Sequence, residues 1–144
     1  CVDLSRKLLD QLLQRYANQC ITPHLESYMT YRYPHREFDY VIASSTLHHL
    51  VDDEKRQLYL KLREALTKDG CLIVGDYFVS AEIAEQRLEQ YNQLISRGVD
   101  LRNGKYHFDI PTTVENEKRL LVEAGFASVD TVWESSNFSI IAAR

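Results

Sequence analysis

Two short apolar runs joined by one amphipathic segment constrain this chain more than any other feature. The first run lies within residues 38–50 and the second within residues 71–76. Apolar runs without an in/out alternation are typical of parallel strands that are buried on both faces. The segment between them predicts a helix over residues 53–66 and a turn over residues 68–70. Together they predict a strand-helix-strand unit.

The rest of the chain continues this alternation of helices and strands. Glycine and small polar residues mark the breaks between periodic segments. We expect a three-layer α/β fold with a mostly parallel sheet and an antiparallel final strand, formed by one domain over residues 1–144. The further elements we expect are a helix over 5–18, a strand over 25–30, a helix over 80–96, a helix over 112–126 and a hairpin of 129–133 with 138–143.

Side chains at the expected helix ends supply capping signals. Asp52 or Asp53 is placed to cap the helix that follows, and Gly70 is placed to end it. Thr112 and Glu115 have the spacing of a capping box, and a second glycine, Gly125, stands where the last helix is expected to stop.

The sequences of several segments resemble those of a known family. "FDYVIASSTLHHL" and "LREALTKDGCLIVGDYF" are similar to the fourth and fifth strands of class I S-adenosylmethionine-dependent methyltransferases. There a Phe-Asp pair opens one strand, a Leu-His-His-Leu-like segment leads into a helix, and a Lys-x-Gly turn enters the next strand. "VDLS" resembles the end of the second strand, and "TTVENEKRLLVEAGF" with "SSNFSIIAAR" resembles the branch that builds carboxymethoxy-type modifications on the wobble uridine of tRNA.

The resemblance implies an S-adenosylmethionine cofactor with a defined binding edge. An acidic residue at the end of the second strand accepts hydrogen bonds from the ribose hydroxyls, as in dinucleotide-binding folds. Asp3 has that place, although an Asp before a helix also serves as a cap. The cofactor-binding residues implied are Asp3, Leu4, Met29, Thr30, Ser44 and Ser45.

One element of the family pattern is absent from the sequence. The cofactor needs a close backbone approach at the end of the first strand, which glycines permit. The five glycines here form no G-x-G cluster. We therefore expect the fold to be incomplete at its N-terminus, by at least one strand-helix unit of roughly 30 residues. An uncovered sheet edge would then favour a homo-oligomer or an exchange of elements.

The histidine pair of the "LHHL" segment invites two interpretations. His48 and His49, followed by Asp52 and Asp53, are residue types that bind zinc or iron. Adjacent histidines diverge on a regular backbone, so we predict no metal and expect one histidine to line the cleft. His49 is also a suitable general base, because imidazole titrates near neutral pH.

Residues after the second apolar run are candidates for an acceptor pocket. Besides His49 they are Tyr77, Tyr91 and Arg102. In the tRNA-modifying branch, an arginine in the segment of Arg102 can hold a carboxylated cofactor. A phosphate patch of Arg97, Arg102 and Lys105 is the alternative use of this segment.

Composition narrows the function classes. The net charge of −4 argues against a generally basic nucleic-acid-binding surface. Three unclustered cysteines suit a reducing compartment, and we expect a cytoplasmic protein without a membrane span. Direct methyl transfer to a small molecule or to an RNA base, such as one in tRNA, is the leading prediction. A degenerate methyltransferase-like binding or regulatory subunit and a nucleotide-dependent oxidoreductase are the alternatives.

Overall fold

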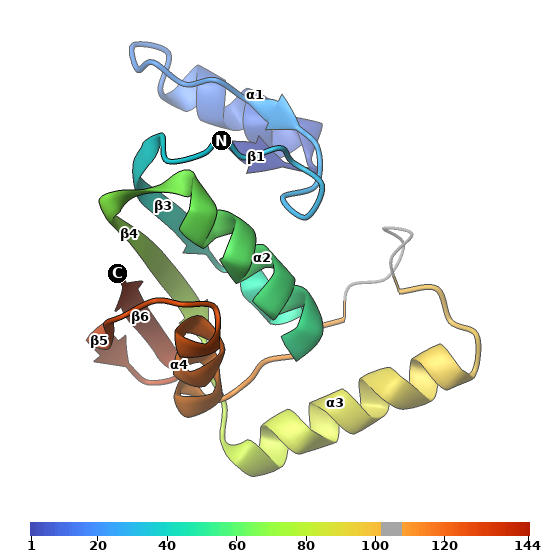
Figure 1. The fold of residues 1–144 in the computed structure, drawn as a ribbon. Coiled ribbons are helices and arrows are strands. Elements are labelled where there is room, and N and C mark those ends of the chain that lie inside the picture. Colours follow the sequence, from blue (N-terminus) through green and yellow to red (C-terminus); the bar gives the residue numbers. More distant parts are fainter. Residues whose placement is uncertain (102–107) are drawn as a thin grey trace. The chain divides into compact units, whose positions relative to one another are not determined.

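The chain divides into two compact units, residues 1–34 and residues 35–144. The computed structural model describes residues 1–101 and 108–144, and Figure 1 shows the elements of both units. Within the described residues, no helix combines the length and the apolar character that a membrane crossing requires. The single domain predicted over residues 1–144 stays a prediction.

The first unit contains one helix and two short parallel strands. β1 (Val2–Asp3) pairs with β2 (His24–Leu25), and α1 (Arg6–Arg15) follows β1. The hydroxyl of Ser5 caps α1 by accepting a hydrogen bond from the Leu8 amide at 3.3 Å. The strand predicted over residues 25–30 is wrong beyond Leu25. There the carbonyl of Ser27 accepts hydrogen bonds from the next turn of backbone, so the chain bends instead of extending.

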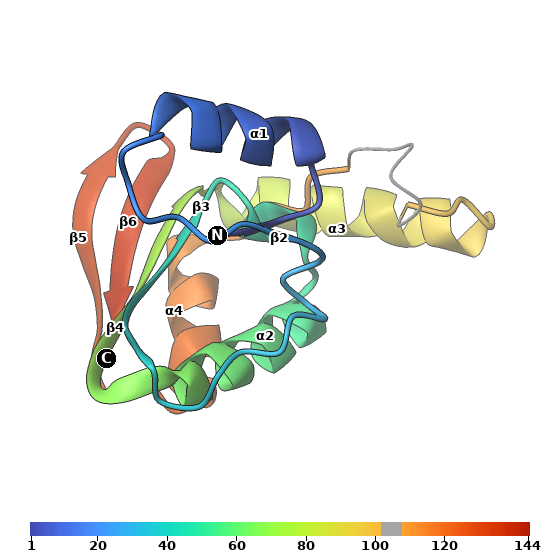
Figure 2. The ribbon, with the colours of Figure 1, turned by 90° about the horizontal axis from the view of Figure 1, so that it is seen from above.

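The second unit contains a four-stranded sheet in the order β3-β4-β6-β5. Its strands are β3 (Phe38–Ser44), β4 (Leu66–Tyr77), β5 (Val129–Ser135) and β6 (Phe138–Ala143). β3 and β4 are parallel, whereas β6 is antiparallel to both of its neighbours, as the arrows in Figure 2 show. The antiparallel final strand is confirmed. The mostly parallel sheet is not, because this sheet is mixed and only its β3–β4 pairing is parallel.

Two helices cover one face of this sheet, and a third projects from it. α2 (Asp52–Ala65) and α4 (Val114–Glu123) lie against the strands in Figure 1. α3 (Ala81–Ser96), capped by Ser80, extends away from the sheet in Figures 1 and 2 and buries none of its side chains. On β3, Tyr40 and Ile42 share a face and are 68% and 70% exposed.

A buried ionic cluster joins α2 to α4. The Lys55 ammonium donates to a carboxylate oxygen of Glu117 at 2.5 Å, and the Tyr59 hydroxyl donates to the other oxygen. All three side chains are buried, and Glu117 is 0% exposed. Burial, together with the Glu117 charge, raises the pKa of Tyr59 well above its usual range. The phenol therefore stays protonated and keeps its role as a donor.

Three of the predicted caps are wrong in detail. α2 ends at Ala65 and β4 begins at the next residue, so the predicted turn over 68–70 is strand and Gly70 does not end the helix. A Cβ on Gly70 would lie 2.9 Å from the carbonyl oxygen of Phe38, which explains the glycine. Val51, not an aspartate, precedes α2. Thr113, not Thr112, caps α4.

The other end of α4 agrees with the sequence prediction. Gly125 follows the last helical turn with a φ of 92°, in the left-handed region that glycine adopts without strain. Its amide donates to the carbonyl of Val122 at 3.0 Å. The predicted hairpin over residues 129–143 is confirmed by the β5–β6 pairing.

Candidate functional site

The carboxyl ends of β3 and β4 lie at one edge of the second unit's sheet. Ser44 is the last residue of β3 and pairs with Gly75, close to the end of β4. Ser45 has a φ of 50°, and its amide donates to the Gly75 carbonyl at 2.8 Å. This strained residue turns the chain out of the sheet. Ligands of open α/β sheets bind at the carboxyl edge of the strands.

A buried carboxylate, Asp76, organises this edge. It accepts hydrogen bonds from the amides of Leu47 at 3.0 Å, His48 at 3.2 Å and Tyr77 at 2.9 Å. The Nδ1 atom of His48 lies 2.7 Å from the Asp76 oxygen that also accepts from the Tyr77 amide. Burial alone would raise the pKa of Asp76, but the His48 hydrogen bond and charge, with the amides of Tyr77 and Leu47, outweigh it and lower the pKa. The side chain is therefore an anion at neutral pH.

The Asp76 anion fixes the orientation of the His48 ring. A carboxylate only accepts hydrogen bonds, so Nδ1 of His48 carries the hydrogen, and Nε2 presents a lone pair when the ring is in its neutral form. That Nε2 lies 3.8 Å from an Asp109 carboxylate oxygen. The amide of Ile110 donates to the His48 carbonyl at 2.6 Å, which holds the Asp109 segment beside the ring.

The second histidine joins the same group. His48 and His49 belong to the short 3₁₀ helix η1 (Leu47–His49), and their ring centroids are 4.1 Å apart. Nδ1 of His49 lies 3.3 Å from the Asp109 oxygen that faces His48. The expectation that the two rings diverge is wrong, because the 3₁₀ turn at the strand end brings them together.

Tyr77 completes what we call the His-Asp cluster, defined as His48, His49, Asp76, Tyr77 and Asp109. Its ring packs against His48 with centroids 4.6 Å apart. Burial, followed by a hydrogen bond to Asp109 and the charge of that carboxylate, raises the pKa of Tyr77. The phenol therefore stays protonated and donates to Asp109. The cluster can accept a proton or coordinate a cation, because it presents an imidazole lone pair and a carboxylate to the same point.

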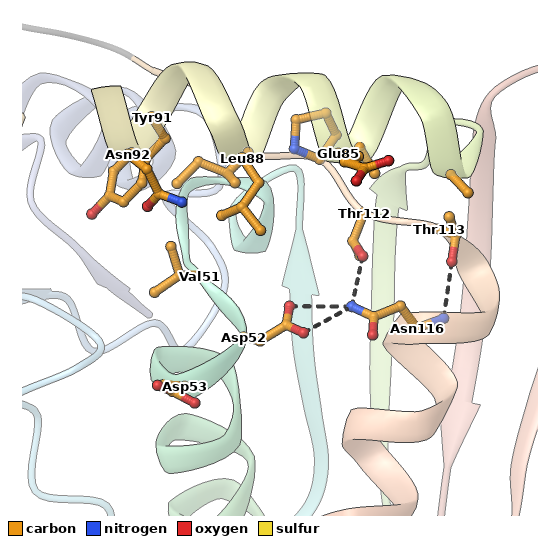
Figure 3. A pocket seen from close by; sticks show the side chains of 14 residues that line it. Val51, Asp52, Asp53, Glu85, Leu88, Tyr91, Asn92, Thr112, Thr113 and Asn116 are labelled. Atoms are coloured by element: carbon orange, nitrogen blue, oxygen red, sulfur yellow. Dashed lines mark hydrogen bonds between the residues drawn. The ribbon is translucent and has the colours of Figure 1, made fainter. Parts of the chain in front are cut away.

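A pocket of about 630 Å³ lies beside the cluster. It is bounded by the start of α2, one face of α3 and residues 110–116, and Figure 3 shows Leu88 and Tyr91 on its wall. The side-chain amide of Asn116 donates to Asp52 at 3.1 Å and to Thr112 at 2.7 Å. The bond to Asp52 links α4 to the start of α2 beside the pocket. None of the His-Asp cluster lines it, but Ile110, next to Asp109, does.

Four predicted cofactor residues lie in the first unit. The Asp3 carboxylate, at the end of β1, accepts a hydrogen bond from the Ser5 amide at 2.6 Å, and Leu4 is 71% exposed. Met29 and Thr30 both bond to Ser27 in the turn after β2. Since β1 and β2 are parallel neighbours, the chain leaves both strands at the same edge of this small sheet. Their role in binding a cofactor stays a prediction.

The other predicted residues lie in the second unit. Ser44 ends β3 and Ser45 follows it, whereas His49 and Tyr77 belong to the His-Asp cluster. Tyr91 instead stands on the pocket wall, with its ring 6.2 Å from that of Phe108. Arg102 and Lys105 fall outside the described residues.

The carboxylates that contact the histidines are not the ones that follow them directly in the sequence. Asp53 pairs with Arg56 at 2.6 Å and Asp52 accepts from Asn116, so neither belongs to the cluster. Asp76 and Asp109 are the carboxylates that contact the two histidine rings. Asp76 could have been found, because it stands at the end of an apolar run that is parallel to the run before the histidines. Asp109 has no such signal, because it lies in an irregular segment more than fifty residues after His49 in the sequence.

Comparison with known proteins identifies the fold. Residues 1–70, slightly less than half of the chain, match a family model described as a methyltransferase domain. No curated protein matches the chain. A possible exported protein from Bordetella parapertussis superposes with a TM-score of 0.72 at 18% identity, covering 99% of this chain and 51% of that one.

Two further structures carry a function in their description. A methyltransferase from Mesorhizobium loti that depends on S-adenosylmethionine has a TM-score of 0.71 at 17% identity, over 99% of this chain and 78% of that one. One from Leishmania major has a TM-score of 0.68 at 15% identity, over 99% and 52%. This chain spans about half the length of the Bordetella and Leishmania structures. The chain shares its fold with these two S-adenosylmethionine-dependent methyltransferases.

Proposed function

We propose that this protein is a methyltransferase that uses S-adenosylmethionine. The observation that carries the proposal is the sheet order β3-β4-β6-β5 with an antiparallel β6, in a fold shared with two methyltransferases. The family model over residues 1–70 supports the same activity from the sequence. An oxidoreductase is disfavoured, because both named functions among these neighbours are methyl transfer.

The residues at the strand ends suit such a cofactor. The half-buried Asp3 carboxylate has one oxygen bonded to the Ser5 amide, which leaves acceptor capacity for ribose hydroxyls. Ser44 ends β3, Ser45 follows it with a φ of 50°, and both residues are exposed at the carboxyl edge of the sheet. When bound, S-adenosylmethionine supplies an activated methyl group, and the chain's part is to align a nucleophile with it.

We place the acceptor at the His-Asp cluster and the adjoining pocket. The pocket volume of about 630 Å³ falls within the range of small-molecule sites. The His48 lone pair and the Asp109 carboxylate can take up the proton that an O–H or N–H acceptor loses. We therefore favour the hypothesis that the acceptor is a small molecule rather than an RNA base. The resemblance to tRNA-modifying enzymes keeps tRNA as the second candidate.

Calorimetric titration of S-adenosylmethionine into the full-length gene product tests this proposal. We expect Asp3→Ala to weaken binding by about one to two decades, since a hydrogen-bonded charge is worth roughly 1.5–3 kcal/mol. Asp10→Ala, on the exposed side of α1, is the matched control and should bind like the parent. Absence of binding by the parent would favour the degenerate binding subunit, and equal binding by both variants would make Asp3 a helix cap only.

A further inference from the structure

We infer that His48, His49 and Asp109 form a binding site for one divalent transition-metal ion. Three potential ligand atoms, one from each residue, lie within 4.8 Å of one another. They come from two segments that are far apart in the sequence, the turn after β3 and the chain before α4. Such convergence of imidazole and carboxylate is the donor set that zinc, iron and similar ions select.

The distances between the ligand atoms suit a shared ion. Nδ1 of His49 lies 3.3 Å and Nε2 of His48 lies 3.8 Å from the same oxygen of Asp109. Ligands at about 2.1 Å from a metal are separated by roughly 3.0–3.5 Å in tetrahedral or octahedral geometry. Small side-chain movements therefore close the site around an ion.

The surroundings of His48 match those of a metal-binding histidine. Such a histidine usually donates its other ring N–H to a carboxylate, which fixes the tautomer and aims the lone pair. Asp76 does this for His48 at 2.7 Å, and three backbone amides hold Asp76 in turn. With Nδ1–H directed at Asp76, the lone pair of Nε2 faces the Asp109 anion. A proton or a metal ion between these two atoms would satisfy both of them.

The Asp109 ligand is also supported and accessible. The Tyr77 hydroxyl donates to its carboxylate, and the side chain is 40% exposed, compared with 27% for His49 and 10% for His48. Three protein ligands with one open side leave a position for another ligand. Resting on the proposed methyltransferase function, we assign that position to the oxygen or nitrogen of the acceptor. With the ion bound, His48 and Asp109 are ligands and no longer take up the acceptor's proton, which the ion makes easier to lose to water.

The test is a titration with metal ions alone, without S-adenosylmethionine. The protein carries Cys1→Ser and Cys20→Ser, because both thiols are exposed and would bind soft ions themselves. Zn²⁺ binding is measured by calorimetry, and Co²⁺ binding by its visible absorption. The variants are His49→Ala and Asp109→Ala, with the exposed His35→Ala as the matched control. Circular dichroism verifies folding, and His49→Gln and Asp109→Asn replace any variant that fails to fold.

We expect one equivalent of Zn²⁺ per chain and a loss of at least tenfold in affinity in each cluster variant, with no change in His35→Ala. No binding by the parent, binding that both cluster variants retain, or an equal loss in His35→Ala would overturn the site. A separate titration with S-adenosylmethionine distinguishes the two proposals. Metal binding without cofactor binding leaves the site and refutes the methyltransferase function, whereas cofactor binding without metal binding refutes the site alone.

Discussion

Removing the negative charge of the buried cluster between α2 and α4 should destabilise the second unit strongly. Glu117 is 0% exposed and its partner Lys55 is 2% exposed, so Glu117→Gln leaves an ammonium group buried beside a neutral amide. Loss of one partner of a buried ion pair costs about 3–5 kcal/mol. The amide oxygen of Gln still accepts from Tyr59, so this variant isolates the charge. With an m-value of about 2 kcal/mol/M, the urea midpoint should fall by roughly 2 M.

A second substitution tests the reasoning behind this magnitude. Lys55→Met combined with Glu117→Gln removes the unpaired charge and should recover most of the loss, because a buried pair is often replaceable by apolar groups without net cost. Glu123→Gln, which breaks the partly exposed pairs with Arg56 and Arg119, is the control and should barely move the midpoint. A single-variant loss below about 1 kcal/mol, or a double variant as unstable as the sum of its singles, would refute the argument.

Three further predictions concern other parts of the chain. Gly70→Ala should destabilise the protein by about 1–3 kcal/mol, because its Cβ would lie 2.9 Å from a backbone oxygen. Gly75→Ala, whose Cβ would meet only the side chains of Phe138 and Ile140 at 3.4 Å or more, should be nearly neutral in the same urea assay. β3 is an edge strand of the described sheet, and its Ile42 is 70% exposed, so we expect the chain to self-associate in analytical ultracentrifugation. Ile42→Lys should reduce this association, and a monomeric parent protein would contradict the expectation. Burial raises the pKa of Tyr33 from 10.0 to about 12, so the unfolded state loses the phenol proton at a lower pH than the folded state. The free energy of unfolding should therefore fall as the pH rises between these two values, and it should fall less steeply in Tyr33→Phe.

The sequence predicts the elements well where periodicity and end signals agree. α3 was expected over residues 80–96 and is found at Ala81–Ser96, because Ser80 caps it and an apolar stripe follows. Prediction fails at the junction of α2 and β4. There the sequence offers a Lys-x-Gly turn, yet pairing of β4 with β3 extends the strand back to Leu66. A long-range hydrogen-bond ladder decides that boundary, and local sequence does not encode it.

The candidate site was predicted in its position but not in its composition. The logic of strand ends places Ser44, His49 and Tyr77 at the carboxyl edge of the sheet, where the structure also has them. It does not find the acids that contact the histidines, because Asp52 and Asp53, which are near in sequence, bond to Asn116 and Arg56 instead. Asp109 reaches the cluster through one backbone bond from Ile110 to His48, a contact that becomes visible only in three dimensions.

The bonding of Asp76 has a consequence for how this protein can change by mutation. One carboxylate fastens the turn after β3 to the end of β4 and also aims the His48 ring. A substitution there alters the yield of folded protein and the chemistry at the edge at once. Libraries screened for new acceptors will therefore lose Asp76 variants at the expression step, before any activity is read. Variation should be directed to the face of α3 around Leu88, where exposed side chains border the pocket without holding the sheet together.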